Sequence, residues 1–418
     1  MDSGQIAWYL TAGVIVLFMT PGIAFFYGGL VKSRSVISML MLSFGAMGIV
    51  GVLWVLYGFN MGTMASGDGN FIPHFVGSPF SDFGLTDMAK SGENDGFLAV
   101  FYGSTFAMAT VALVSGAIAD RARFLPWMLF AGLWATFNYF LVAGWVWSPG
   151  GWVFELGDTL GFDVSTIDYA GGTAVHINSA AAALALAIVL GKRVGFAKGA
   201  DKAHNVPLTL IGVAILFMGW FGFNGGAAAL VKFDSLGLII VNTFVAATAG
   251  ILGWIAMERM KEGKATSVGA GSGAIAGLVA ITPACANLYP VWAILLGLLA
   301  GGLCCWAVEL KYKFGFDDSL DVVGIHGVGG FLGCWYLGFF ATDTGLFFGA
   351  GPEQLVVQVL ASVGVAVFSL VITFIIGGAI EKTIGFRVAN EDELAGVDQT
   401  VHGEEAYAFN PDPEPVPA

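Results

Sequence analysis

Long apolar runs divide this chain from end to end, and no other feature restricts its fold as strongly. A helix that crosses a bilayer needs roughly 20 apolar residues to span about 30 Å of hydrocarbon. Eleven runs approach that length, and the eighth is the weakest because Gly, Ala and Ser replace larger apolar residues in it. The runs do not alternate with a period of two, which favours helices over a β-barrel. They cover about residues 5–31, 36–61, 97–118, 124–147, 170–191, 207–231, 236–257, 266–284, 289–308, 322–341 and 355–380.

Composition excludes most other classes of protein. Of the 418 residues, 57% are hydrophobic and 11% are charged, whereas a soluble domain carries about 25% charged residues. The net charge of −13 offers no basic surface to nucleic acid. The four cysteines lie inside apolar runs without metal-ligand spacing, so we expect small buried side chains and no metal site. The first run lacks a basic segment and a cleavage site, so we interpret it as a membrane helix and not as a signal peptide.

The basic residues predict the orientation. Eleven spans place the two termini on opposite sides of the membrane, and fifteen of the seventeen Lys and Arg then fall on one side. Only Lys90 and Lys232 fall on the other. Because basic residues gather in cytoplasmic loops, we expect the N-terminus outside and the C-terminus in the cytoplasm, in the plasma (inner) membrane. Thirteen of the thirty acidic residues fall on the outer side. That negative surface favours a cationic substrate over an anionic one.

The chain divides into a membrane domain, residues 1–383, and an acidic C-terminal tail, residues 384–418. The tail is either a disordered segment or a cytoplasmic regulatory segment, and its Pro-rich end at 410–418 cannot hold a helix. The outer loop at about 62–94 is rich in Gly, Ser, Asp and Pro, so we expect it to be irregular.

Glycines at four-residue spacing predict close helix packing. Small residues at this spacing form a ridge that lets two helix backbones approach each other. We assign these ridges to packing and not to substrate binding. They are Gly269/Gly273/Gly277, Gly297/Gly301 and Gly329/Gly333.

Two histidines, His176 and His326, lie within apolar spans, where an ionisable group is costly and points to function. Asp168 precedes the first by eight residues, and Asp318 precedes the second by eight. Eight residues of continuous helix rise about 12 Å, so we expect each histidine near the bilayer midplane, reached from opposite faces. Spans one to five and six to ten then form an inverted repeat, with span eleven outside it. The other three histidines are expected to be solvated: His74, His204 and His402.

Two neutral imidazoles in contact form a chain of hydrogen-bond donors and acceptors. Phe and Leu around them disfavour the imidazolium, and a permanently charged permeant would lose its hydration at large cost. A small weak base that leaves its proton at the entrance would cross as a neutral molecule and avoid that cost. The sequence offers no nucleophile–base set beside these rings, which disfavours an enzyme.

Aromatic residues near the outer ends of two spans fit a cation that arrives charged. Trp147 ends span four, and Tyr102 and Phe106 lie one turn apart in span three. Aromatic faces bind ammonium-type cations. Phe223, in span six, is placed to narrow the passage together with Phe106. An interfacial aromatic belt is the alternative for Trp147, and core or lipid contact is the alternative for either phenylalanine.

The chain resembles the ammonium transporter family, the Amt/Mep/Rh proteins. The resemblance extends from Phe25–Gly29 to the tail's Gly385–Val388 and His402–Glu404. Its specific motifs are DYAGGTAVHIN (168–178), MGWFGFNGG (218–226), ITPA (281–284) and DDSLDVVGIHG (317–327).

The resemblance implies eleven transmembrane helices and a homotrimer with one pore per subunit. It implies a twin-histidine pore of His176 and His326, an outer recruitment site around Trp147 and Phe106, and a gate of Phe106 and Phe223. It makes Asp168 a helix-capping acid near that site. It further implies a PII-type nitrogen regulatory protein as a partner at the cytoplasmic face. Four more residues of the matched motifs are expected to support the pore: Asp318, Asp321, Asn224 and Thr282.

The sequence departs from the family pattern at the recruitment site. Ala227 stands where many bacterial members place a serine, which removes one hydrogen bond of order 1 kcal/mol. Tyr102 stands where a phenylalanine is common, and we expect its hydroxyl to substitute in part.

We therefore predict an all-α polytopic membrane protein that transports ammonium or ammonia, with methylammonium as an analogue and without a cofactor. NH4+ is recruited outside and deprotonated, and NH3 passes the histidines, with the proton returning or relayed separately. Two alternatives stay open. One is an ammonium sensor that signals through the tail, and the other is a channel for a different small neutral molecule such as water or CO2.

Overall fold

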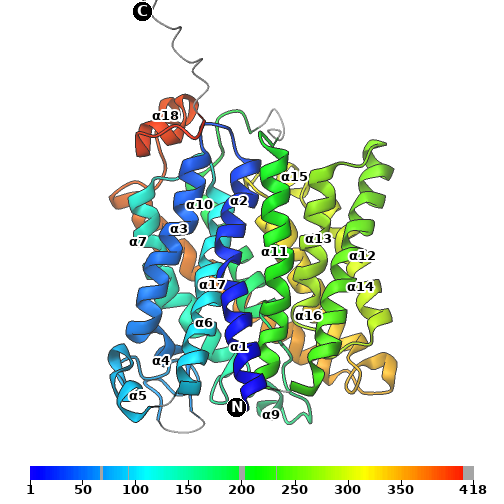
Figure 1. The fold of residues 1–418 in the computed structure, drawn as a ribbon. Helices are drawn as coiled ribbons and strands as arrows, with labels where there is room; N and C mark the ends of the chain where they lie inside the picture. The colour runs from blue at the N-terminus through cyan, green and yellow to red at the C-terminus, as the bar shows by residue number, and fades with distance from the viewer. Residues whose placement is uncertain (66–68, 93, 197–202, 232, 408–418) are drawn as a thin grey trace, which may run out of the picture.

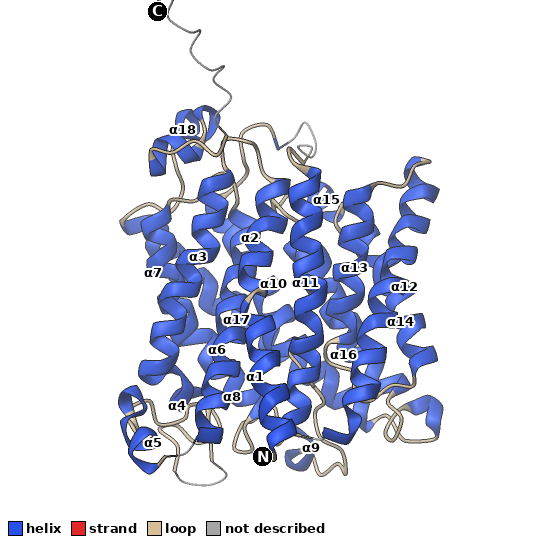
Figure 2. Cartoon of the chain, in the orientation of Figure 1, coloured by secondary structure: helices blue, strands red, loops and turns tan. Residues whose placement is uncertain are grey.

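A computed structural model of the protein describes residues 1–65, 69–92, 94–196, 203–231 and 233–407. Over these residues the chain is built almost entirely of helices joined by loops (Figure 2). Its only β-type pairings there are two isolated bridges, Ile72 with Val76 and Ala122 with Arg387. The all-α prediction is confirmed.

In the part of the chain that the structure describes, ten helical segments are long and apolar enough to cross a membrane. A shorter apolar helix, α13 (Ser267–Ile281), stands where the eighth and weakest run was predicted. The ten segments are Ser3–Leu30 (α1 Ser3–Leu17 and α2 Met19–Leu30), Val36–Gly62 (α3 Val36–Leu53 to α4 Phe59–Gly62), Asn94–Ile118 (mainly α6 Asn94–Val114), Phe124–Trp147 (α7 Phe124–Trp134 to α8 Phe140–Trp147), Gly172–Leu190 (η5 Gly172–Ile177 and α10 Asn178–Leu190), Val206–Ala229 (mainly α11 Val206–Gly226), Phe233–Glu262 (mainly α12 Leu236–Glu262), Pro290–Phe314 (α14 Pro290–Ala307 and α15 Leu310–Phe314), Val323–Phe340 (η9 Val323–Gly327 and α16 Val328–Phe340) and Glu353–Thr383 (α17).

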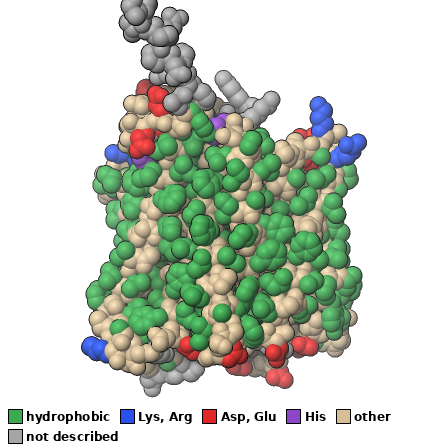
Figure 3. Space-filling model, viewed as in Figure 1, with side chains coloured by type: hydrophobic (Ala, Val, Ile, Leu, Met, Phe, Trp, Pro, Cys, Tyr) green, Lys and Arg blue, Asp and Glu red, His purple; other side chains and the backbone are tan. Residues whose placement is uncertain are grey.

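The helices run side by side through one bundle, and the two chain ends leave it at opposite ends (Figure 1). We call these the N-terminal end and the C-terminal end of the bundle. The short helices α5 (Thr86–Ser91) and α9 (Leu156–Thr159) lie at the N-terminal end, and α15 and α18 (Asn390–Ala395) lie at the C-terminal end. Hydrophobic side chains cover the middle of the visible face, and charged side chains gather near its two ends (Figure 3). This is the distribution expected of a membrane protein.

Glycine ridges bring three helices together in the second half of the chain. A Cβ at Gly277 of α13 or at Gly297 of α14 would collide with the carbonyl oxygen of Ala246 in α12. A Cβ at Gly301 would collide with the carbonyl oxygen of Gly250. Because α13 and α14 both approach the α12 backbone this closely, only glycine fits at these positions. The predicted packing role is confirmed.

Spans five and ten enter the bundle from opposite ends, as an inverted repeat requires. Each begins with a π-helical turn that carries its histidine, η5 for His176 and η9 for His326. The expected eight-residue helix from aspartate to histidine is wrong, since helix begins only at Gly172 and Val323. The aspartates lie in the irregular segments before these turns, because their side chains bind the free N–H groups at the helix starts.

The segment after α17 returns to the C-terminal end of the bundle and packs there. Val388 N–H donates to the Arg121 carbonyl (2.9 Å), and the carboxylate of Asp398 accepts from the N–H groups of Ile37 and Ser38. A disordered tail is therefore wrong for residues up to 407. The Pro-rich end at 410–418 lies outside the described residues. The loop at 62–94, expected to be irregular, contains α5 and a 3-10 turn at Phe83–Leu85.

Two of the histidines expected to be solvated are half-buried. His204 Nδ1 lies 2.7 Å from the Val31 carbonyl and Nε2 lies 2.8 Å from the Tyr407 hydroxyl, while His402 packs edge-on against Phe124. The returning C-terminal segment covers the loop of His204 and carries His402 itself, and the sequence does not reveal this packing. His74 is more open and pairs with Glu155 at 2.9 Å. The four cysteines are free and buried, as expected: Cys285, Cys304, Cys305 and Cys334.

Candidate functional site

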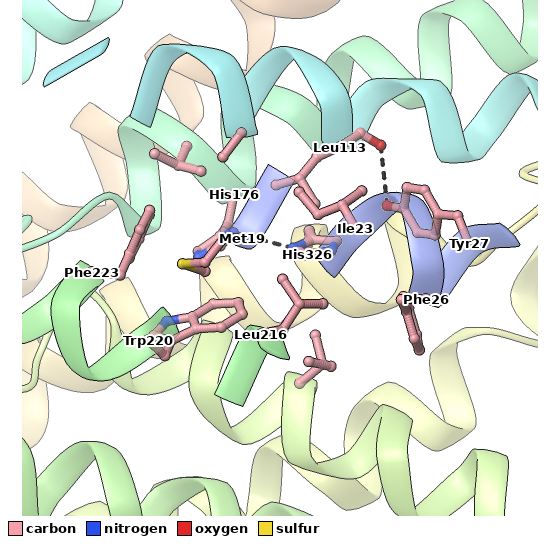
Figure 4. Close-up of a pocket in the computed structure, with 13 residues that line it drawn as sticks. Met19, Ile23, Phe26, Tyr27, Leu113, His176, Leu216, Trp220, Phe223 and His326 are labelled. Carbon is pink, nitrogen blue, oxygen red and sulfur yellow. Dashed lines mark hydrogen bonds between the residues drawn. The ribbon is translucent and has the colours of Figure 1, made fainter. Parts of the chain in front are cut away.

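The two histidines predicted to meet do meet. Their Nδ1 atoms lie 3.1 Å apart and the ring centroids 5.2 Å apart. Figure 4 shows the rings joined through these nitrogens between the surrounding apolar side chains. His176 is 1% exposed and His326 is 3% exposed. One Nδ1 donates and the other accepts, so the pair holds one shared proton position along its axis.

A narrow apolar cavity runs along the pair. Its volume is about 20 Å³, which is on the scale that holds a single water-sized molecule. The Nε2 atom of His176 has no hydrogen-bond partner among the described residues. A small guest with N–H or lone-pair character can form a hydrogen bond there. Besides the histidines, the lining residues are Met19, Ile23, Phe26, Tyr27, Ala109, Leu113, Val175, Leu216, Trp220, Phe223 and Ile275.

Aromatic rings close the cavity toward the N-terminal end. Phe106 of α6 and Phe223 of α11 stack with centroids 4.0 Å apart and planes 11° apart. Trp147 meets Phe106 edge-on at 5.9 Å, and Phe223 lies 6.2 Å from His176. The rings thus form a continuous series of contacts from the end of α8 to the histidine pair. Both side chains of this stack are buried, with Phe106 3% exposed and Phe223 1% exposed. A gate formed by these two rings stays a prediction.

Trp220 is a site residue that the sequence analysis missed. Its indole stacks on His176 at 5.6 Å with planes 22° apart. Its Nε1–H donates to the hydroxyl of Thr282 (2.8 Å), which itself donates to the Leu278 carbonyl. Thr282, predicted to support the pore, therefore contacts the indole that fixes the His176 ring. The signal available was the position of Trp220 three residues before Phe223, on the same face of α11.

Asp168 lies beside the N-terminal start of η5. Its Oδ1 accepts from the N–H groups of Gly171 (3.0 Å) and Gly172 (2.6 Å), and its Oδ2 from those of Thr173 and Ala174 (2.9 Å each). Burial raises the pKa of the Asp168 carboxyl, and the four N–H donors offset part of that rise. The carbonyl oxygen of Asp168 accepts from Trp147 Nε1 at 2.9 Å. The carboxylate is thus held by backbone and joined to the aromatic entrance.

Asp318 holds the start of η9 in the same way. Its carboxylate accepts from the N–H groups of Val322 (3.1 Å) and Val323 (2.7 Å). Lys311 Nζ donates to the Asp318 carbonyl (2.9 Å) and to the Asp321 carboxylate (2.6 Å). Burial raises the pKa of Asp318 to about 6, although Lys311 acts in the opposite direction.

A buried ion cluster adjoins this second turn. Arg193 binds Asp317 (2.9 Å) and Asp120 (3.1 Å). Burial alone would raise the pKa of Asp317, but its bonds to the Arg193 guanidinium outweigh burial and hold the pKa below its usual range. Arg121 is fully buried and donates to the Asp317 carbonyl and the Ser319 hydroxyl (2.6 Å each). The C-terminal end of the passage is therefore surrounded by compensated charges.

The remaining predicted residues lie around the end of α11. The Tyr102 hydroxyl donates to the carbonyl of Phe223 (2.7 Å), and its ring contacts Phe106 at 4.8 Å. Its hydrogen is therefore committed to backbone, so the hydroxyl can act toward an incoming N–H group only as an acceptor. Ala227 is buried in the 3-10 turn after α11. Asn224 Nδ2 donates to Thr243 (3.0 Å), which ties α11 to α12 away from the histidine pair.

Comparison with known proteins gives one family. A family model described as Ammonium Transporter Family matches residues 7–407. An ammonium transporter of Mycobacterium bovis is 44% identical, over 98% of this chain and 91% of the relative. One of Bacillus subtilis is 41% identical, over 97% and 99%.

Solved structures agree. The crystal structure of Candida albicans Mep2 matches with a TM-score of 0.83 at 31% identity, covering 94% of this chain and 88% of that one. A protein named as a sensor Amt protein matches with a TM-score of 0.85 at 26% identity, covering 95% and 98%. This multi-pass membrane protein belongs to the ammonium transporter family.

Proposed function

We propose that this chain transports ammonium by recruiting NH4+ at the N-terminal end of the bundle and conducting NH3 past the histidine pair. The observation that carries the proposal is the continuous series of rings Trp147, Phe106, Phe223, His176 and His326. It runs from a charged surface into an apolar cavity of molecular width. Family membership supports ammonium as the substrate.

Recruitment rests on Trp147, Phe106 and Asp168. The ring faces attract an ammonium-type cation. The buried carboxylate of Asp168 supplies a negative field, and its four hydrogen-bond donors among the described residues are backbone N–H groups and not side-chain cations. Tyr102 contributes oxygen lone pairs, which accept from N–H groups where Ala227 offers none. The cation is held next to the stacked phenylalanines, and a shift of these two rings opens the cavity to the NH3 that the cation releases.

Deprotonation takes place before the cavity, because the apolar lining cannot replace the hydration of an ion. NH3 is small and neutral and hydrogen-bonds to the imidazole nitrogens as it passes. The proton either returns to the side it came from, giving electroneutral transport, or is relayed along the imidazoles, giving net charge transfer. Current driven by an ammonium gradient across a reconstituted bilayer distinguishes the two.

The oligomeric state, the membrane orientation and the regulatory partner are inferred from the family and from the charge distribution. We propose a homotrimer in the plasma membrane, with the N-terminus outside and residues 384–418 as a cytoplasmic regulatory segment. A PII-type regulator at the cytoplasmic face is the partner that the family suggests. The packing of the C-terminal segment against the loops at its end of the bundle supports a regulatory role.

The direct test is uptake of radiolabelled methylammonium by proteoliposomes that contain the purified protein. The proposal predicts saturable uptake that ammonium competes for. Water or CO2 permeation without methylammonium uptake would instead support a channel for another neutral molecule.

An ammonium sensor is the second candidate, favoured by the docked C-terminal segment and by the likeness to a sensor Amt protein. In a sensor, flux is minor and the tail carries the signal. Growth on limiting ammonium, rescued by a variant truncated after Thr383, would argue against that candidate.

A further inference from the structure

Two glutamines lie one turn apart on α17, in the span that stands outside the inverted repeat. Gln354 and Gln358 are each 1% exposed. A buried amide in a membrane helix is costly unless its hydrogen bonds are made. Neither side chain contacts the histidine pair or lines the cavity, so the pore itself does not account for them.

Gln358 binds both backbone groups of one residue. Its Oε1 accepts from the Ile167 N–H (2.8 Å), and its Nε2 donates to the Ile167 carbonyl (2.7 Å). The second hydrogen of Nε2 donates to the Cys334 carbonyl of α16 (3.2 Å). The amide thus fastens residue 167 to α17 and α16 as a neighbouring β-strand would.

Gln354 extends the same attachment. Its Nε2 donates to the Ser165 carbonyl (3.1 Å) and to Gln358 Oε1 (3.3 Å), and its Oε1 accepts from the Thr344 hydroxyl (2.7 Å). Together the two glutamines fix residues 165–167, an irregular segment that has no helix of its own to hold it.

The fastened residue directly precedes Asp168. The carbonyl of Asp168 orients the Trp147 indole, and its carboxylate caps η5. Moving Ile167 therefore moves both the charge and the aromatic ring of the recruitment site. A lysine or arginine could hold the same backbone carbonyls, but its charge would cancel the field of Asp168. A neutral amide holds the segment and leaves that field in place.

We propose that Gln358 is a positioning residue for cation recruitment, so that span eleven sets the place of Asp168 and Trp147. This inference rests on the proposed function and deepens it. Asp168 caps η5 through its own local bonds, so loss of the Gln358 amide displaces the recruitment site without removing it. The effect falls on substrate affinity more than on turnover.

The experiment compares Gln358→Leu with Thr373→Val in proteoliposomes. Thr373 is a matched control, since its hydroxyl is also a buried hydrogen-bond partner on α17. It accepts from Trp134 Nε1 (2.8 Å) and, among the described residues, has no bond to the segment that carries Asp168. We expect Gln358→Leu to raise the KM for methylammonium about tenfold with kcat within about twofold, on the scale of the two hydrogen bonds that it removes from Ile167. Thr373→Val should leave KM within about twofold. Equal KM values for the two variants would overturn the inference while the wild-type uptake upholds the proposed function.

A second variant covers a failure of Gln358→Leu to fold. In Gln358→Glu the protonated carboxyl donates and accepts as the amide does, whereas the carboxylate cannot donate to the Ile167 carbonyl. Its KM should approach the wild-type value at low pH and exceed it as pH rises. A KM ratio to wild type that is constant with pH contradicts the inference.

Hydrogen exchange decides the matter independently of transport. The amides of residues 167–174 should exchange faster in Gln358→Leu than in wild type or Thr373→Val. Unchanged exchange there overturns the inference even if the wild-type protein takes up no methylammonium, a result that would separately reject the proposed function.

Discussion

The turns that begin span five and span ten are built alike. In each, an aspartate carboxylate accepts N–H bonds from the first residues of a π-helical turn, and a histidine follows eight residues after the aspartate. In each, the third residue after the aspartate has a positive φ: Gly171 at 113° and Asp321 at 64°. The backbone path is therefore shared by both halves of the repeat.

The two turns differ in charge. Within the described residues, the four hydrogen bonds to the Asp168 carboxylate come from backbone N–H groups, and the segment before it is fastened by the neutral amide of Gln358. Asp318 lies beside Lys311 and next to the Arg193–Asp317 pair. The first carboxylate is held by backbone N–H groups alone, whereas side-chain cations lie beside the second. Under the proposed function, this difference favours arrival of the cation at the Asp168 end.

The largest expected effect comes from removing the two carboxylates in turn. Asp168→Asn should reduce the initial rate of methylammonium uptake by about 100-fold, since it removes the field that holds the cation and places an N–H₂ group against backbone donors. Asp318→Asn should reduce it by about threefold. Uptake rates per amount of protein in proteoliposomes measure both. Equal losses would mean that the carboxylates serve only as helix caps.

Removing Lys311 tests the compensation at the other turn. Lys311→Met should destabilise the protein by about 2 kcal/mol, because it leaves the Asp321 carboxylate and the Asp318 carbonyl without their partner. Thermal unfolding of the purified protein measures the loss. The double variant Lys311→Met with Asp321→Asn should recover part of it, since asparagine tolerates the positive φ at position 321. If the double variant is no more stable than Lys311→Met, the stability that Lys311 provides does not come from its pairing with Asp321.

A smaller effect is expected from pH at Asp318. Its pKa is about 6 in the folded chain against an ordinary 3.8. Between these values the folded state holds a proton that the unfolded state has released, so this group costs stability as pH rises through the window. The melting temperature of wild type relative to Asp318→Asn should therefore rise by a few degrees, about 2–4 °C, between about pH 7.5 and about pH 5. A constant difference would contradict the assigned pKa.

The spans and the meeting of the histidines were predictable from sequence. Membrane helices can be recognised as long apolar runs, because a segment in lipid must pair its backbone N–H and C=O groups within its own helix. The shared eight-residue spacing of Asp168–His176 and Asp318–His326 indicated two equivalent halves. The predicted continuous helix from Asp168 to His176 was wrong over residues 168–171. There the Asp168 carboxylate binds backbone N–H groups and Gly171 has a φ of 113°.

Other parts of the site depend on contacts that sequence does not contain. The hydroxyl that orients Trp220 lies 62 residues away in Thr282, and the segment that covers His204 arrives from residue 407. Gln358 did leave a signal, since a glutamine within an apolar run, here 355–380, is unusual at membrane depth.

The measurement that tests the account most directly is the charge moved per methylammonium taken up across a reconstituted bilayer. It compares wild type with His176→Ala and His326→Ala. The account predicts uptake by wild type at a fixed ratio, and a changed rate or a changed ratio in each variant, because the substrate passes both rings. Uptake by either variant at the wild-type rate and with the wild-type ratio would contradict the account, since the substrate would then cross by another path.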